Sequence, residues 1–530
     1  YQKISNVVPN QKLTINFTDA KENWVYDTLT ITNHSLLTQA KLPGVQHHEN
    51  PFNDFTEQTL LPGYLSRQGP SIEVADVNKD GLDDFFIGGA KNQASQIFIQ
   101  NRNGTFSKKT EPALLKDSLS EDVAALFFDT DGDGDKDLYV GSGGYEFTED
   151  DAALQDRLYI NDGKGNFSRK KTALPAMRIS TGCVKEADID ADGDKDLFVG
   201  GRLVPGNYPV TPGSKMLLND GKGNFTDETA AIAPAIQKIG MVTDAVWIDI
   251  NKDKAPDLVV AGEWMPIKVF INQKGKFTDQ SSTYIHFASS GWWNRINATD
   301  MDGDGDTDLI VGNCGLNTQF HVDEKEPMTI HYKDFDNNGS VDPVLCYYIN
   351  GVSYPVASRD DITDQLPGLK KKFLEYKDYA NATINDLFTE DQLKGADVLK
   401  AETMETVYLE NTGNTGFALR TLPLQAQYAP VYAIAATDIN QDGKKDILLA
   451  GNNTWTRIKF GRYSANHGIA MLGDGKGNFK YLAQNESGLN IRGNVRSLEV
   501  ISVGKNLEWI CGSNDAPAEM IKQNKALLTK

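Results

Sequence analysis

Short acidic loops carry the residues whose types and spacing could do chemistry. The loop from Asp129 to Asp137 has carboxylates at its first, third, fifth and ninth positions. Its seventh position can offer a backbone carbonyl, and Gly134 at the sixth permits a sharp reversal, because glycine adopts positive φ without a Cβ clash. Calcium takes about six to eight hard oxygen ligands in flexible geometry. The loop therefore predicts a Ca²⁺ site.

Seven loops of this kind occur, and the same positions are the candidate Ca²⁺ ligands in each. The expected ligands are Asp76, Asn78, Asp80, Leu82 and Asp84; Asp129, Asp131, Asp133, Asp135 and Asp137; Asp188, Asp190, Asp192, Asp194 and Asp196; Asp249, Asn251, Asp253 and Asp257; Asp300, Asp302, Asp304, Asp306 and Asp308; Asp334, Asp336, Asn338, Ser340 and Asp342; and Asp438, Asn440, Asp442, Lys444 and Asp446.

Two loops depart from the pattern. The loop at Asp249 has Lys254 in place of the glycine and Lys252 among its ligands, which predicts weak binding or none. The loop at Asp334 has Asn338 at its fifth position and one negative charge fewer, which predicts weaker binding. The chain is thus expected to hold about six or seven Ca²⁺ ions, with a structural role, since crowded carboxylates must be neutralised before each loop closes.

These loops are not EF-hands, although they begin alike. An EF-hand needs Glu at its twelfth position and a helix on either side. Here that position is Val140 in the second loop and Val199 in the third, each within a strand-forming run. Turns rich in Asp and Gly that bind no metal are the alternative, and regular recurrence in register with strands argues against it.

The elements that position the loops repeat at a regular interval. The first five loops start about 50 to 60 residues apart, which fits one four-stranded propeller blade. Each loop lies between two apolar strands, and a second signature such as RLYINDGKGNF or KMLLNDGKGNF follows. That signature is typical of a third strand, a tight turn and a fourth strand. The predicted fold class is all-β: a seven-bladed β-propeller with calcium-binding loops.

The fifth repeat contains extra residues. The loop at Asp334 is interpreted as the hairpin between the third and fourth strands of the fifth blade. Residues 358–402 show apolar residues at helical spacing, and Thr389 to Gln392 form a capping box. They predict a helical insertion in or after the fifth blade, which serves either recognition or packing.

The last blade is expected over residues 496–521, with a metal-free loop. It lacks a fourth strand, which residues 55–61 are expected to supply, so that the ring closes and no sheet edge stays exposed. The propeller is predicted to span residues 46–522, with a short tail at 523–530.

Composition limits the classes of molecule that the chain is expected to bind. The net charge of −20 disfavours direct binding to nucleic acid or to anionic membrane. The sequence contains no run of 18 apolar residues, so no transmembrane segment is predicted. The four cysteines include no CxxC pair that could bind zinc. One alternative is a disulfide between Cys314 and Cys346; the other, which we favour, is that all four cysteines are buried free thiols.

The repeated loops and strands resemble the FG-GAP/VCBS repeats of integrin α-subunit propellers and of cartilage acidic protein. YQKISNVVPNQKLTINFTDA at the start resembles the end of an ASPIC/UnbV module, which assigns residues 1–45 to the tail of a preceding module and a linker. The whole is most similar to large FG-GAP–ASPIC/UnbV proteins of Bacteroidota-type bacteria. That resemblance implies export to the cell surface or outer membrane, lipid anchoring through a preceding part, and partnership with a SusC/SusD-like transporter or assembly complex.

Three functions are weighed. The first is a non-catalytic binding or scaffold subunit. The second is a glycan-binding propeller that uses the aromatic residues Trp264, Trp292, Trp293 and Trp455, although tryptophans in propellers are more often core residues. The third is a carbohydrate-active enzyme with paired carboxylates. No catalytic residue is predicted, since His47-His48-Glu49 lacks HExxH spacing, and we expect the chain not to be an enzyme.

Overall fold

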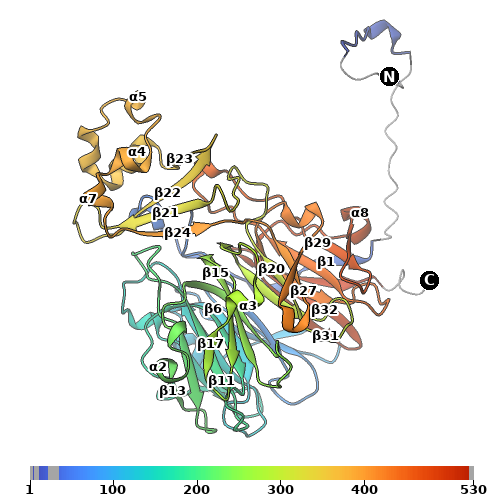
Figure 1. Ribbon diagram of the computed structural model, residues 1–530. Coiled ribbons are helices and arrows are strands. Elements are labelled where there is room, and N and C mark those ends of the chain that lie inside the picture. Colours follow the sequence, from blue (N-terminus) through green and yellow to red (C-terminus); the bar gives the residue numbers. More distant parts are fainter. Residues whose placement is uncertain (1–3, 5–10, 22–34, 525–530) are drawn as a thin grey trace.

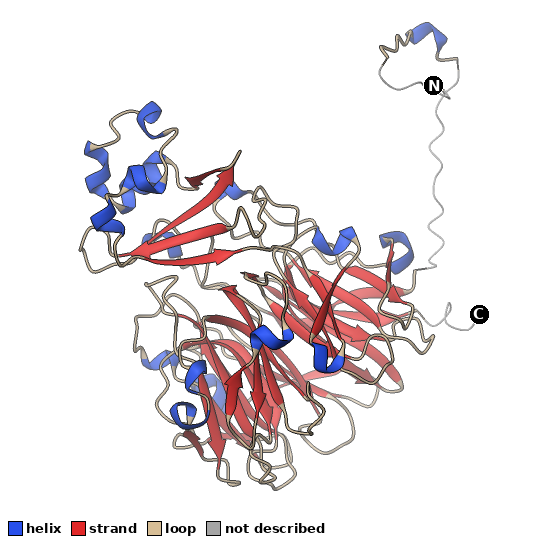
Figure 2. Cartoon of the chain, in the orientation of Figure 1, coloured by secondary structure: helices blue, strands red, loops and turns tan. Residues whose placement is uncertain are grey.

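The structure, a computed structural model, describes residues 4, 11–21 and 35–524. Residues 1–3 and 5–10 of the ASPIC/UnbV-like start therefore lie outside the described residues. Within 35–524 the chain forms eight antiparallel sheets and a few short helices (Figures 1 and 2). The fold is all-β, as the alternation of strands and Gly/Asn/Asp turns predicted.

Seven sheets follow the repeat. Their strands, from first to fourth, are β2 (Ile72–Ala75), β3 (Asp84–Ile87), β4 (Gln96–Gln100) and β5 (Phe106–Lys109); β6 (Glu121–Phe128), β7 (Asp137–Gly143), β8 (Arg157–Asn161) and β9 (Phe167–Arg169); β10 (Ser180–Ala187), β11 (Asp196–Leu203), β12 (Lys215–Asn219) and β13 (Phe225–Asp227); β14 (Met241–Ile248), β15 (Asp257–Met265), β16 (Lys268–Asn272) and β17 (Phe277–Asp279), with β18 (Gly291–Trp292) beside β15; β19 (Arg295–Thr299), β20 (Asp308–Gly312), β25 (Val407–Asn411) and β26 (Phe417–Thr421); β27 (Val431–Thr437), β28 (Asp446–Gly451), β29 (Ile469–Gly473) and β30 (Phe479–Leu482); and β31 (Asn494–Val503), β32 (Asn506–Asn514), β33 (Pro517–Gln523) and β1 (Leu37–Gln46).

The first strands of these sheets lie side by side. β6 contacts β2 and β10, and the contacts continue through β14, β19, β27 and β31. β31 in turn contacts β2. Apolar side chains fill the space between neighbouring sheets; Phe86 and Ile97 of the first sheet, for example, share a buried cluster with Leu138 and Tyr159 of the second. Each sheet therefore buries both faces against its neighbours.

The last sheet takes its outer strand from the start of the described chain. β1 pairs antiparallel with β33, from Leu37 opposite Gln523 to Gln46 opposite Pro517. Our prediction had assigned this strand to residues 55–61, which instead contain a short 3-10 helix at Asp54–Thr56. Residues 37–45, placed in a linker by the sequence, thus belong to the sheet, because Leu37 and Val45 are buried there.

The insertion in the fifth sheet is larger than predicted. The chain leaves this sheet after β20 and returns at β25, and the residues between form an eighth sheet in the order β23-β22-β21-β24. Its strands are β21 (Met328–Lys333), β22 (Asp342–Ile349), β23 (Val352–Pro355) and β24 (Asp397–Ala401). The interpretation of β21 and β22 as blade strands was wrong, because the β25–β26 hairpin fills those places: Val407 and Leu409 pack against Leu309 and Val311.

Helices cover this eighth sheet. They are α4 (Arg359–Gln365), α5 (Tyr376–Tyr379), α6 (Ile384–Leu387) and α7 (Glu390–Leu393), with a 3-10 helix at Pro367–Lys371. The predicted capping box at Thr389 is present, and the helices share a core of their own with Phe335, Val344 and Phe388. We call the sheet and its helices the inserted module; it projects from the other seven sheets (Figure 1).

Short helices elsewhere lie in connections: α1 (Pro112–Lys116), α2 (Thr229–Ile232), α3 (Ser281–Tyr284) and α8 (Gln484–Ser487), and 3-10 helices at Phe17–Asp19, Ala152–Leu154, Pro234–Ile236, Gly413–Thr415, Leu424–Gln427 and Ile458–Phe460. None of the helices in the described ranges is long and apolar enough to cross a membrane. All four cysteines are buried and free, as we favoured.

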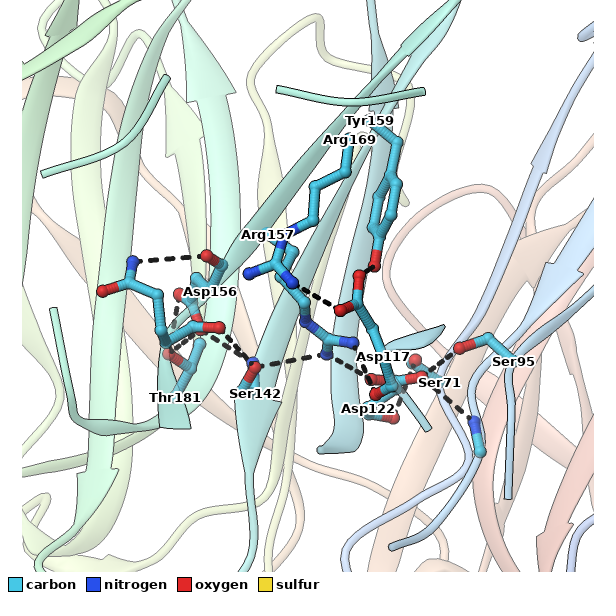
Figure 3. Close-up of polar contacts among 12 residues, drawn as sticks. Ser71, Ser95, Asp117, Asp122, Ser142, Asp156, Arg157, Tyr159, Arg169 and Thr181 are labelled. Atoms are coloured by element: carbon cyan, nitrogen blue, oxygen red, sulfur yellow. Dashed lines mark hydrogen bonds and ion pairs between the residues drawn. The ribbon is translucent and has the colours of Figure 1, made fainter. Parts of the chain in front are cut away.

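A buried polar network ties neighbouring sheets together (Figure 3). The Arg157 guanidinium pairs with the Asp122 carboxylate, and both side chains are almost fully buried. Ser71 of the preceding connection donates to the Asp122 carbonyl at 3.1 Å. Thr181 of the following sheet donates to the Asp156 carboxylate, which also accepts from the backbone of the second sheet. The network therefore fixes three successive sheets relative to one another.

Candidate metal loops

Six of the acidic loops connect the first and second strands of successive sheets, so the fold places them at the same end of the strands. The seventh, from Asp334 to Asp342, connects β21 and β22 in the inserted module. The sixth position has positive φ in every loop: 82° at Gly81, 83° at Gly134, 101° at Gly193, 73° at Lys254, 94° at Gly305, 88° at Gly339 and 85° at Gly443. The fourth loop thus places a lysine where the other six use glycine.

Four loops bring three carboxylates together. In each, one oxygen from every member of the group lies within 4.8 Å of the others. The groups are Asp129, Asp131 and Asp137; Asp188, Asp190 and Asp196; Asp300, Asp302 and Asp304; and Asp334, Asp336 and Asp342. The remaining three loops have Asn78, Asn251 and Asn440 at the third position, so an amide replaces one carboxylate there.

The aspartate at the ninth position holds each loop closed. The carboxylate of Asp196 accepts hydrogen bonds from the backbone N–H of Ile189 at 3.1 Å and of Asn219 at 2.9 Å. The same pair of acceptances recurs at Asp84, Asp137, Asp257, Asp308 and Asp446. Asp342 differs, since its second oxygen accepts from the side chain of Gln365. The ninth aspartate therefore joins the loop to the third strand, besides being a candidate ligand.

Sequence analysis missed a contact that links one loop to the next sheet. The Asn161 amide at the end of β8 donates to the carbonyl of Val77, inside the preceding sheet's loop, at 2.8 Å. Asn219 donates likewise to Thr130 at 2.9 Å, and Asn272 to Ile189 at 2.8 Å. The signal was the recurrent amide in RLYIN, KMLLN and KVFIN. The first three loops are thus each held by their own sheet and by the next one.

Lysines contact two of the loops from the neighbouring sheet. The Lys252 ammonium lies 2.6 Å from the Asp306 carboxylate, and Lys79 pairs with Asp135. Both aspartates occupy the seventh position, where the backbone carbonyl rather than the side chain was predicted as the ligand. The lysines leave the predicted carbonyl ligands free to face a cation.

The electrostatics of the loops suit a divalent cation. Burial, with the charges of Asp192 and Asp190 next, raises the pKa of Asp194 to about 6. Burial also raises the pKa of Asp196 to about 7, despite its two backbone hydrogen bonds. A bound Ca²⁺ would hold these carboxylates in their ionised form, because it neutralises the charge that burial and repulsion oppose. The residues present therefore fit calcium.

The predicted glycan-contacting tryptophans have two different settings. Trp264 and Trp293 are only 3% and 1% exposed, and they pack in the core, as tryptophans in propellers more often do. Trp292 packs edge-on against Trp264, and Trp455 lies beneath the Arg67 guanidinium. Neither buried ring presents a face to solvent on which a sugar could stack, whereas Trp292 and Trp455 are half-buried, and Trp292 lines a cavity.

Comparison with known proteins supports the repeat assignment. A family model described as FG-GAP-like repeat matches residues 76–140, 129–199, 188–260 and 249–311. The chain is 22% identical to integrin alpha-5 of Xenopus laevis over 263 residues, which is 47% of this chain and 20% of that protein. It is 26% identical to phosphatidylinositol-glycan-specific phospholipase D of Rattus norvegicus over 216 residues, which is 33% of this chain and 24% of that protein. These stretches of the chain carry FG-GAP-like repeats and resemble integrin α.

Both curated relatives are much longer than the matched region, since the chain spans about a quarter or less of each. Two solved structures superpose loosely, both at TM-score 0.41. One is described as YCF48 bound to D1 peptide, with 8% identity over 92% of this chain and 97% of that chain. The other is an ancestral GH74 enzyme, with 9% identity over 87% of this chain and 48% of that chain. Neither carries a functional argument.

Proposed function

We propose that residues 37–523 form a seven-bladed, calcium-binding β-propeller that acts outside the cytoplasm as a non-catalytic binding or scaffold subunit. The contacts among the seven first strands, together with the pairing of β1 with β33, support a ring of seven blades. The four carboxylate groups and the integrin-like repeats support calcium binding. Calcium-bound loops would make the ring rigid, which suits a platform for partners.

The inserted module is the proposed recognition surface, and its exposed apolar side chains are the observation that carries the proposal. It adds no strand to the seven repeat sheets, and its helices have a cluster of their own, while Met328, Ile330 and Ala401 of its strands pack with Met241 and Trp264 of the fourth sheet. Leu374 is 72% exposed, and Tyr376, Val398 and Ile349 are exposed as well. Contiguous exposed apolar patches mark protein interaction sites, and we propose that these side chains of the module belong to one.

The partner class is proposed from the family resemblance. We propose an outer-membrane transporter of the SusC/SusD type or an assembly complex, met at the cell surface by a lipid-anchored protein. The experiment is to cross-link the calcium-saturated full chain in its native envelope, purify it, and identify by mass spectrometry what comes with it. We expect one outer-membrane protein in stoichiometric amount.

A matched pair of variants locates the contact. Leu374→Asp places a charge on the inserted module and should abolish recovery of the partner. Leu119→Asp changes an equally apolar side chain, 64% exposed, far from that module in the sequence, and should leave recovery intact. A monomer that recovers no protein would refute the scaffold proposal and favour the glycan-binding alternative, which a glycan array would then test.

A further inference from the structure

A cavity at the centre of the seven sheets is lined by four arginines. Its volume is about 120 Å³, and the guanidinium groups come from Arg67, Arg202, Arg295 and Arg496. Arg67 precedes β2, Arg202 ends β11, Arg295 begins β19 and Arg496 lies near the start of β31. No acidic side chain of the described chain lines this cavity. Four positive charges thus converge inside a protein whose net charge is −20.

Only two of these arginines have a carboxylate partner. Arg202 pairs with Glu263, and Arg295 lies 3.1 Å from Glu499 and 3.4 Å from Asp244. Across residues 35–524, no carboxylate lies within 4 Å of Arg67 or Arg496. The charge of Glu49 acts on both from further away. Two guanidinium charges therefore remain uncompensated at close range.

Some guanidinium donors in the cavity also lack an acceptor. Arg67 Nε and Arg202 Nη1 are buried, and neither finds a hydrogen-bond partner in the described part of the chain. Arg496 donates only to backbone carbonyls, those of Asn452 at 3.1 Å and Val495 at 3.0 Å, besides a longer contact to Arg67. Burial lowers the pKa of the Arg496 guanidinium. Buried donors without acceptors are unfavourable, so the site is incomplete without a further acceptor.

Aromatic rings hold the two unpaired guanidinium groups in place. The Arg67 guanidinium lies 4.0 Å from the centre of the Trp455 ring and 5.2 Å from that of Tyr64. The Arg496 guanidinium lies 4.2 Å from the centre of the Tyr432 ring. Cation–π contacts of this kind orient a guanidinium without using its N–H donors. The donors of Arg67, and the Nη2 group of Arg496, find no acceptor within the described residues and can bind a planar or tetrahedral oxyanion.

The cavity continues in both directions. An adjoining cavity of about 90 Å³ shares Tyr64, Arg202 and Tyr432 with it, and reaches Trp292 and Tyr463. On the other side, a cavity of about 60 Å³ shares Arg295 and Arg496, and reaches Lys185, Glu73 and Asp244. Two further cavities thus adjoin the arginines, which gives a ligand larger than a single ion room to extend.

We propose that this central cavity is a binding site for an oxyanion group, either a carboxylate or a tetrahedral sulfate or phosphate, carried by a small molecule. Arg67 and Arg496 supply the uncompensated charge, and Arg202 supplies a free donor. Guanidinium groups bind such oxyanions through paired N–H donors. The inference goes beyond the proposed function, because it concerns the interior of the ring and not a partner on the inserted module.

The experiment titrates the calcium-saturated full chain with sodium sulfate and, separately, with sodium glucuronate, by calorimetry in a chloride-only buffer. Glucose serves as the uncharged control. We expect one binding event, accompanied by a change in fluorescence because Trp455 lies against Arg67. Binding of sulfate alone would identify a tetrahedral ligand group, and binding of glucuronate alone a carboxylate.

Variants tie the binding to the cavity. Arg67→Gln and Arg496→Gln should each weaken binding by about tenfold or more, since each removes charge-assisted hydrogen bonds. Arg420→Gln removes an exposed arginine outside the cavity and should change nothing. Arg496→Gln also removes hydrogen bonds to backbone carbonyls, so Arg67→Gln decides the question if Arg496→Gln fails to fold. The proposal is overturned if neither anion binds the unaltered chain, if glucose binds equally well, or if Arg67→Gln binds as tightly as Arg420→Gln.

Discussion

Replacing Asp190 by Asn should change the free energy of unfolding in opposite directions with and without calcium. Asp190 occupies the third position of the loop from Asp188 to Asp196, and its carboxylate belongs to a group whose oxygens lie within 4.8 Å. Burial, with the charge of Asp192 next, raises the pKa of Asp190. A raised pKa means that the ionised carboxylate destabilises the metal-free loop at neutral pH, and Asn removes that charge. The same substitution removes a calcium ligand.

The two effects have different magnitudes. Without calcium, Asp190→Asn should raise the free energy of unfolding by only a few tenths of a kcal/mol, because the side chain is exposed and screened by solvent. With calcium at a hundredfold excess over Kd, each site contributes about 2.7 kcal/mol, and a tenfold loss of affinity reduces that to about 1.4 kcal/mol. The variant should therefore be slightly more stable in chelator and about 1 kcal/mol less stable in calcium.

The assay is urea unfolding, followed by tryptophan fluorescence in calcium and in chelator, with native mass spectrometry to count bound ions. Asp253→Asn is the matched control, since Asp253 is equally exposed but belongs to the loop with Lys254 at the glycine position. It should leave the calcium-dependent stability unchanged. If Asp190→Asn lowers stability equally with and without calcium, its role is structural and the metal assignment of this loop is wrong.

Three further predictions concern the fold and its buried charges. Leu37→Ala should lower the free energy of unfolding by about 2–5 kcal/mol, because Leu37 is buried in the strand that completes the last sheet. The control Leu13→Ala, at an exposed site, should change it by under about 0.5 kcal/mol. Equal effects of the two substitutions in denaturant unfolding would count against the β1–β33 pairing. Arg157→Met should lower it by about 3–5 kcal/mol because it leaves the Asp122 carboxylate buried without its partner, and calorimetry that shows no change would contradict this. Burial raises the pKa of Glu73 from 4.5 to about 8, so the contribution of Glu73 to stability is fully present below pH 4.5 and is lost as the pH rises through 8. The difference in free energy of unfolding between the unaltered chain and Glu73→Gln should decline over that pH range. A difference that does not vary with pH would refute the raised pKa.

Local spacing predicted the repeated part of the fold well. A loop such as Asp129–Asp137 and its two strands lie within about twenty residues, so alternation and turn chemistry specify them without knowledge of the rest of the chain. The same reasoning anticipated Lys254 as the exception among the sixth positions. It failed where the repeat is interrupted, because the β21–β22 hairpin and the β25–β26 hairpin have equally good strand patterns, and only packing against Leu309 and Val311 decides between them.

The sequence predicted that an N-terminal segment completes the last sheet, but it did not predict which residues form that strand. An open sheet edge demands a partner, yet residues 55–61 and 37–46 both offer apolar residues, and register follows from burial of Leu37 and Val45 against the last sheet. The acidic loops were predictable because their residues are neighbours in sequence. The Asn161 contact to Val77 was not, since its two ends lie in different repeats.

The arginine cavity shows why such sites escape repeat analysis. A repeat assigns the same role to the same position in every sheet, but the equivalent bulge positions of the first strands contribute Val123, Gly182 and Arg496 to the cavity. The repeat sheets share the acidic residues of their loops, whereas the side chains that differ between them line the cavity. In a ring of similar blades, a ligand group at the centre contacts several blades at once, so a few unlike side chains suffice to make a specific site there. The chain has 73 acidic residues, yet none of those in residues 35–524 places a carboxylate within 4 Å of Arg67 or Arg496, and this is therefore the feature that most needs a ligand to explain it.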